Sequence, residues 1–107
     1  MHLVCVQIQP NLLTTFDEHA IEALRAIDAP EIENVETNRG QNDGPYINVI
    51  YTTSNPRLLW SSVREELIRL GLQGAAIVTC TGTRGWDNYL LLHHFSCEVP
   101  NARFGAY

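Results

Sequence analysis

Residues 46–53 read YINVIYTT, and SNP follows at 54–56. Every residue of the first stretch except Asn48 is β-branched or aromatic, which favours a β-strand. Asn55 is a good N-cap for a helix, and Pro56 suits the first helical position, where its missing N–H costs nothing. The stretch therefore predicts a strand that passes almost directly into a helix.

The helix after Pro56 is predicted by an apolar stripe at helical spacing. The stripe consists of Leu59, Val63, Leu67 and Leu70, broadened by Leu58 and Trp60. Gly71 can adopt the left-handed conformation that ends many helices. We therefore expect this helix to stop just before Gly71 and to bury one face.

Four other segments have the composition of strands, and we expect them at 3–9, 31–38, 75–81 and 89–95. The first places Val4, Val6 and Ile8 on one face. The second carries three glutamates, which suits a solvated edge strand. The loops at 39–45 (RGQNDGP) and 82–88 (GTRGWDN) are polar and rich in glycine, as expected for turns.

An earlier helix is predicted between the first two strands. Thr15 and Glu18 fit a capping box, in which each side chain reaches the other residue's free backbone N–H. An apolar face follows at helical spacing, made of Phe16, Ala20, Ala23, Leu24 and Ile27. Pro30 disfavours helical geometry in the residue before it and ends the helix.

The predicted order is β-α-β-β-α-β with one additional strand, in a single domain over 1–107 whose residues 96–107 form a tail. This order resembles the ferredoxin-like split βαβ motif over about 95 residues. The resemblance implies an α+β fold with an antiparallel sheet and two helices on one face. The first and third strands would lie side by side at the centre, and the additional strand would extend the sheet by a C-terminal hairpin.

The charge balance limits the classes of partner. Twelve acidic and seven basic side chains give a formal charge of −5, which argues against nucleic acid and against an anionic membrane surface. It is compatible with a basic protein partner, and also with the ordinary mild acidity of cytosolic domains. Three cysteines at wide spacing, with no signal peptide or membrane span in the sequence, suggest a cytoplasmic protein with reduced thiols.

No motif names a reaction or a cofactor. His93 and His94 are adjacent in a predicted strand and point to opposite faces, so they are poorly placed to bind one metal ion with Cys80 or Cys97. Asp87 with either histidine could support acid–base chemistry, but no sequence motif of a catalytic site accompanies these residues. The chain has no lysine and hence no phosphate-binding P-loop, and its central strand lacks the aromatic pattern of an RNA-recognition domain.

Two groups of residues are candidates for binding a protein partner. Arg84, Trp86 and Asp87 lie in the last loop, and tryptophan and arginine are frequent interface hot spots. The alternative for Trp86 is that it folds back over the hairpin. The second group is acidic and consists of Glu31, Glu33, Glu36 and Asp43. These residues would contact a basic partner. The alternative is that they only form a solvated edge of the sheet.

These features lead to two functional hypotheses. The first is a small cytosolic inhibitor of a basic protein, such as an immunity protein that neutralises a toxin enzyme. The second is a protein that dimerises, or that binds or transforms a small molecule, on the exposed sheet face. In that case Tyr89, Leu91, His93 and Phe95 would share one face of the last strand by its period of two. Neither hypothesis requires a cofactor.

Overall fold

The fold is known from a computed structural model, which describes residues 1–82 and 84–96. The predicted tail beyond Ser96, including Cys97, and position 83 of the predicted loop lie outside these residues. Seven main elements follow one another along the chain, with 3-10 turns at η1 (Pro10–Leu12) and η2 (Gln73–Ala75). They are β1 (His2–Ile8), α1 (His19–Arg25), β2 (Ile32–Gln41), β3 (Pro45–Thr53), α2 (Pro56–Leu70), β4 (Ala76–Gly82) and β5 (Gly85–His93).

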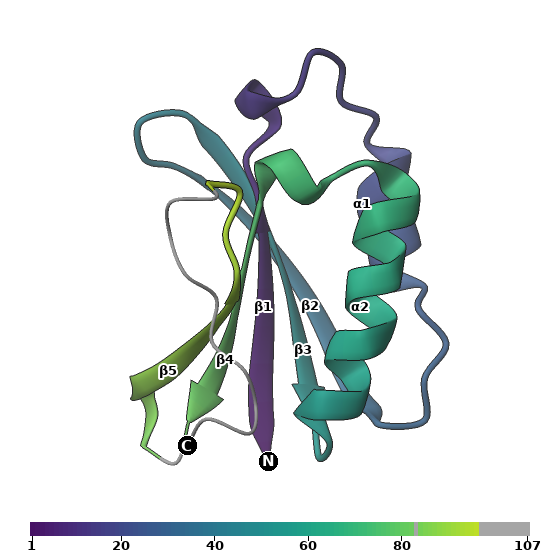
Figure 1. Cartoon of the computed structure of the whole chain (residues 1–107), viewed down its shortest axis with the longest axis vertical. Coiled ribbons are helices and arrows are strands. Elements are labelled where there is room, and N and C mark those ends of the chain that lie inside the picture. Colours follow the sequence, from purple (N-terminus) through teal and green to yellow (C-terminus); the bar gives the residue numbers. More distant parts are fainter. Residues whose placement is uncertain (83, 97–107) are drawn as a thin grey trace.

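The described strands form one antiparallel sheet in the order β2-β3-β1-β4-β5, so β2 and β5 are its edges. Strands β1 and β3 are neighbours, and β5 extends the sheet beyond β4. Both helices pack on the same side of the sheet, and no helix of residues 1–82 and 84–96 covers its other side (Figure 1). The α+β class and the five-stranded antiparallel sheet with two helices are therefore as expected.

The hydrophobic core lies between the sheet and the helices. Each central strand buries every second residue, because successive side chains point to opposite faces. The strands contribute Val4, Val6, Ile8, Ile47, Val49, Tyr51 and Val78, and the helices contribute Ile21, Leu24, Leu59, Val63 and Leu67. The buried Tyr51 hydroxyl donates a hydrogen bond to the carbonyl oxygen of Leu24, 2.5 Å away, and so ties β3 to α1.

Helix α2 begins and ends where the sequence predicts. The side-chain oxygen of Asn55 accepts a hydrogen bond from the backbone N–H of Leu58 at 3.2 Å. Gly71 ends the helix with φ of 70°, and the N–H of Leu72 reaches the carbonyl of Leu67. Trp60 packs against the core, whereas Leu58 is about half exposed and does not broaden the buried stripe.

Helix α1 is shorter than predicted, and its predicted capping box is wrong. It begins at His19, whose N–H donates to Oδ1 of Asp17 at 2.9 Å. The Glu18 carboxylate is instead bound by the Arg39 guanidinium through two contacts of 2.8 Å. A charged partner from β2 thus binds the Glu18 side chain, and Asp17 rather than Thr15 accepts a hydrogen bond from the first N–H of the helix.

Candidate functional site

The strongest candidate site is a hollow on the sheet face that carries no helix, beside the β5 edge. Its volume is about 570 Å³. In β4, Ile77 and Thr79 alternate with buried Ala76, Val78 and Cys80, so they project to this open face. The six residues that line the hollow are Ile77, Thr79, Trp86, Tyr89, Leu91 and His94. We call these residues, together with Arg84 and Asp87 nearby in the chain, the β5 surface.

Irregular pairing between β4 and β5 decides which histidine joins the hollow. Thr79 pairs with Leu91, but Val78 pairs with His93 rather than with Leu92. The additional residue on β5 reverses the alternation from that point. His93 therefore lies opposite buried Val78, and its Nε2 contacts the carbonyl oxygen of Gln73 at 2.9 Å.

The sequence predicts that Tyr89, Leu91, His93 and Phe95 share one face of the last strand. Tyr89 and Leu91 do line the hollow together, but the prediction is wrong for His93 and Phe95. His94 lines the hollow with Tyr89 and Leu91, and Phe95 packs against the His94 ring, with ring centroids 4.3 Å apart. The backbone N–H of Ser96 donates to Nδ1 of His94 at 3.0 Å, which favours the neutral tautomer that carries its proton on Nε2. His94 can thus donate one hydrogen bond to a bound group.

Two large aromatic side chains in the hollow are substantially exposed. Trp86 is 45% exposed and Tyr89 is 57% exposed, so Trp86 does not fold away into the core. Both belong to β5, an edge strand, and both line an apolar hollow. Exposed aromatic residues around an apolar depression are typical of surfaces that bind proteins or ligands.

Arg84 and Asp87 are exposed close to Trp86 in the hairpin. The backbone N–H of Arg84 donates to Oδ1 of Asn88 at 2.7 Å, and Gly85 adopts φ of 64° to complete the turn. The loop is much shorter than the predicted 82–88, because β5 already begins at Gly85. The predicted group of Arg84, Trp86 and Asp87 is thus brought together at one corner of the sheet.

The four predicted acidic residues do not join that corner. Glu33 and Glu36 are exposed on β2, at the other edge of the sheet, which lies about 19 Å from β5 at ordinary strand spacing. Asp43 lies in the β2–β3 turn, at the opposite end of the strands from Gly85. Glu31 is only 8% exposed and offers little to a partner. Glu33 and Glu36 therefore share the β2 edge, whereas Asp43 lies beyond the far end of that strand.

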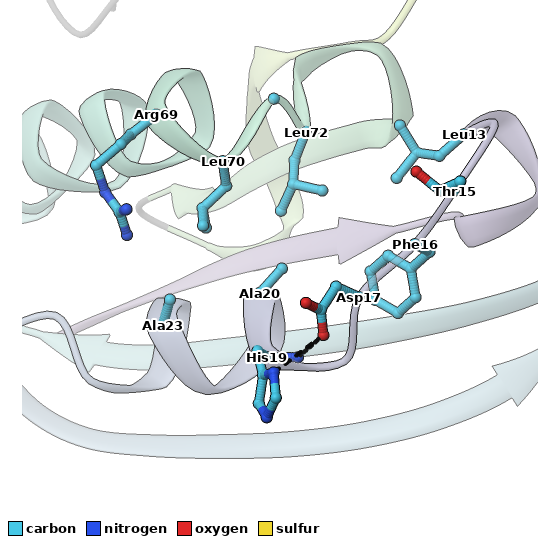
Figure 2. A pocket seen from close by; sticks show the side chains of 11 residues that line it. Leu13, Thr15, Phe16, Asp17, His19, Ala20, Ala23, Arg69, Leu70 and Leu72 are labelled. Atoms are coloured by element: carbon cyan, nitrogen blue, oxygen red, sulfur yellow. Dashed lines mark hydrogen bonds and ion pairs between the residues drawn. The ribbon is translucent and has the colours of Figure 1, made fainter.

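A second hollow, of about 540 Å³, lies between the beginning of α1 and the end of α2 (Figure 2). Leu13, Phe16, Leu70 and Leu72 form its apolar walls. Its charged groups are paired with near neighbours: Asp17 contacts His19 at 3.2 Å, and Arg69 pairs with Glu66 on the same helix. The sequence alone does not reveal this hollow, because the hollow depends on how the two helices meet.

The two described cysteines are thiols on opposite faces of neighbouring strands. Val4 pairs with Cys80 and Cys5 pairs with Thr79, so Cys80 points into the core and Cys5 to the open face. Burial raises the pKa of each thiol to about 11, which makes both poor nucleophiles near neutral pH. Residues 1–82 and 84–96 contain no cluster of three His, Cys, Asp or Glu side chains suited to a metal ion.

No helix in the described part of the chain has the length and apolar character needed to cross a bilayer. Comparisons with protein-family models, curated proteins and solved structures found no match to this chain.

Proposed function

We propose that this chain is a protein-binding module that docks through the β5 surface. The observation that carries the proposal is the exposure of Trp86 and Tyr89 around one apolar hollow on an edge strand. Interfaces gain most of their binding energy from a few large aromatic or arginine side chains surrounded by weaker contacts. The β5 surface has this composition, with Leu91 and Ile77 inside the hollow and Arg84 and Asp87 nearby.

The arrangement of the sheet supports a ferredoxin-like fold with one added strand. The first four strands lie in the order β2-β3-β1-β4 and β5 follows β4 at the edge, as the split βαβ resemblance implies. The two free thiols support a cytoplasmic location, where cysteines are kept reduced. A fold of this kind carries many functions, so the β5 surface rather than the fold supports the binding role.

A binding experiment tests the role of the β5 surface. Tagged chain is used to capture partners from its source cell, the captured protein is purified, and its affinity is measured for variants. Trp86→Ala and Tyr89→Ala should each weaken binding by about tenfold or more, without a large change in melting temperature. Leu58→Ala removes an equally exposed apolar side chain from α2 and should bind like the wild type. Equal affinities for Trp86→Ala and Leu58→Ala would contradict the proposal.

The net charge of −5 favours a second, more specific candidate: an inhibitor of a basic protein, such as an immunity protein that masks a toxin enzyme. Its acidic contact would be the β2 edge, where Glu33 and Glu36 are exposed. Salt should then weaken the complex, and Glu33→Arg should slow association more than it speeds dissociation. A complex insensitive to both changes would argue against this candidate.

The hollow itself supports a small-molecule alternative, with His94 taking the place predicted for His93. An apolar ligand carrying one acceptor could lie on Leu91 and Ile77 and accept a hydrogen bond from His94. Such a ligand should quench Trp86 fluorescence, and the quenching should disappear in Leu91→Asp. Quenching that survives this substitution would place the ligand elsewhere.

A further inference from the structure

A third hollow, of about 210 Å³, lies where the β2–β3 turn meets the end of β1 and the beginning of β3. Four amide side chains line it, those of Gln7, Gln9, Asn42 and Asn48, together with Tyr46. The other two lining residues are the glycine and the proline of the turn. We call this site the amide hollow. It shares no lining residue with the hollow of the β5 surface.

The amide hollow lies on the sheet face that carries no described helix. In β3, Tyr46 and Asn48 alternate with buried Ile47 and Val49, and they therefore project to this face. Gln7 projects to it as well, because Gln7 is directly opposite Asn48 in the β1–β3 pair. The register of the sheet thus brings the polar side chains together.

The lining of the amide hollow limits the kind of ligand that it can hold. The side chains of Asn, Gln, Gly, Pro and Tyr are uncharged near neutral pH, so a charged ligand group would lose its hydration without meeting an opposite charge. Asp43, exposed in the same turn, further disfavours an anion. An apolar ligand would deprive the amides of their hydrogen bonds to water. The site therefore suits an uncharged ligand that both donates and accepts hydrogen bonds.

Two hydrogen bonds orient the amides of the hollow. Nε2 of Gln9 donates to Oε1 of Gln7 at 3.0 Å, and Nδ2 of Asn48 donates to Oδ1 of Asn38 at 2.9 Å. Each primary amide has one NH₂ group and one carbonyl oxygen. Gln7 can therefore offer its NH₂ group to a ligand, whereas Gln9 and Asn48 can offer their carbonyl oxygens.

The carbonyl oxygen of Asn48 is the strongest sign of a ligand. It is buried, and it has no hydrogen-bond partner among residues 1–82 and 84–96. Leaving a buried acceptor without a donor is unfavourable. The flexible Gln7 side chain lies opposite Asn48 and can turn to admit a ligand group. A ligand hydroxyl that reached this oxygen would donate the hydrogen bond that it lacks.

We propose that the amide hollow binds the ring of an uncharged sugar. Every sugar hydroxyl both donates and accepts, so neighbouring hydroxyls can accept from Gln7 and donate to Gln9 and Asn48. The Tyr46 ring lies over Gly40, where a Cβ would overlap it, and offers an aromatic surface to the C–H groups of the sugar. This inference is independent of the protein-binding role proposed for the β5 surface.

The size of the hollow limits the ligand to about one ring. A volume of 210 Å³ is below the range of about 300–1,000 Å³ that is usual for drug-sized ligands. The turn at its rim is held by a hydrogen bond of 2.9 Å from the N–H of Asn42 to the carbonyl oxygen of Gly44. We expect an affinity in the millimolar range, because a single ring makes few contacts.

NMR titration of the isotope-labelled chain tests the site. The methyl glycosides of glucose, galactose and mannose are added separately, and the side-chain NH₂ signals of Gln7, Gln9, Asn42 and Asn48 are followed. At least one glycoside should shift these signals and saturate in the millimolar range. The indole N–H signal of Trp86 should not move, since Trp86 lines the other hollow. If no glycoside shifts the amide signals, or only Trp86 responds, the proposal is overturned.

A matched pair of variants tests the role of the amides. Gln7→Met keeps the length of the side chain and removes its amide. It should weaken glycoside binding by about tenfold or more, because the ligand loses its donor and Gln9 loses the partner that orients it. Asn34→Ala removes an exposed amide of β2 outside the hollow and should bind like the wild type. Thermal unfolding confirms that both are folded, and equal affinities for the two would overturn the site.

N-methylacetamide separates a sugar from a peptide group, which is also uncharged and also donates and accepts. A single peptide group cannot bond to Gln7, Gln9 and Asn48 together, since it has one donor and one acceptor group. The glycosides should therefore bind more tightly than N-methylacetamide in the same titration. An affinity for N-methylacetamide equal to or above that for the glycosides would overturn the sugar and favour a peptide ligand.

Discussion

The two edges of the sheet differ in how they meet solvent. The β2 edge is covered with exposed polar side chains, among them Glu33, Glu36 and Arg39. Arg39 also binds Glu18, just before α1. The β5 edge has one carboxylate, Asp87, and exposes Trp86 and Tyr89 beside an apolar hollow. The two edges of the sheet thus differ in charge and in the apolar side chains that they expose.

The difference in charge affects how readily another strand can pair with each edge. Charges on an edge strand discourage pairing with other chains, since a new strand would have to desolvate them. A chain with two apolar edges would grow without limit, whereas a chain with one can close into a finite pair. The charges of the β2 edge should therefore oppose pairing of another strand at that edge.

The largest effect should come from making the β2 edge resemble β5. Glu33→Val together with Glu36→Val removes the two exposed carboxylates and adds β-branched apolar groups to this edge. Light scattering should show larger species for this variant than for the wild type at the same concentration. Glu65→Val, which removes an exposed carboxylate from α2, is the control. A doubly substituted chain with the wild-type mass would show that charge does not guard this edge.

Two glycines test how tightly each edge strand is packed. A Cβ at Gly82 would overlap the backbone oxygen of Asn88 in β5, whereas a Cβ at Gly40 would overlap the ring and hydroxyl of Tyr46. The Tyr46 side chain can swing aside, but the backbone cannot. Gly82→Ala should therefore lower the unfolding free energy by about 1–3 kcal/mol, and Gly40→Ala by less than about 1 kcal/mol.

Urea unfolding measures both glycine variants. Comparable losses for the two would mean that β5 rearranges as easily as a single side chain, and that the β4–β5 hairpin is held only loosely.

The tie between β3 and α1 stabilises the part of the sheet next to β2. Tyr51→Phe removes the buried hydroxyl that bonds to Leu24 and leaves that carbonyl without its donor. The expected loss is about 1–3 kcal/mol, which should appear as a lower melting temperature. A melting temperature equal to that of the wild type would show that the Leu24 carbonyl accepts a hydrogen bond from another donor in the variant.

Tyr51 should also make stability depend on alkaline pH. Burial raises the pKa of its hydroxyl above that of tyrosine in the unfolded chain, about 10. The folded state therefore holds this proton more tightly, and stability is lost as pH rises above about 10. Tyr51→Phe should flatten this part of the stability curve, measured by thermal unfolding at a series of pH values. If Tyr51→Phe loses stability at alkaline pH as steeply as the wild type does, another titrating group causes that loss.

The sequence predicts elements well where short-range chemistry decides them. Asn55, Pro56 and Gly71 define α2 because each acts on backbone groups within a few residues. It fails at Glu18, whose partner Arg39 lies 21 residues away. It fails again at His93, because the bulge that turns His94 into the hollow depends on how β5 pairs with β4. The sequence also does not show that Asp43, in the turn after β2, lies at the far end of that strand from Glu33.

The smallest effect should come from the ion pair beside the β2 edge. The guanidinium of Arg39 holds the pKa of the Glu18 carboxyl below its usual range. The stabilisation is therefore present above the unfolded pKa, about 4.3, and is lost as pH falls through the lower folded value. Both side chains are more than half exposed, so solvent screens the pair strongly.

Glu18→Gln should accordingly lower the melting temperature less than Tyr51→Phe does, and the difference from the wild type should vanish in strong salt and at low pH. Asp28→Gln, which changes an exposed carboxylate outside the helices and strands, is the control. A loss as large as that of Tyr51→Phe, or one that persists in salt, would mean that Arg39 holds α1 against the sheet. The charges of the β2 edge would then act in folding as well as in guarding that edge.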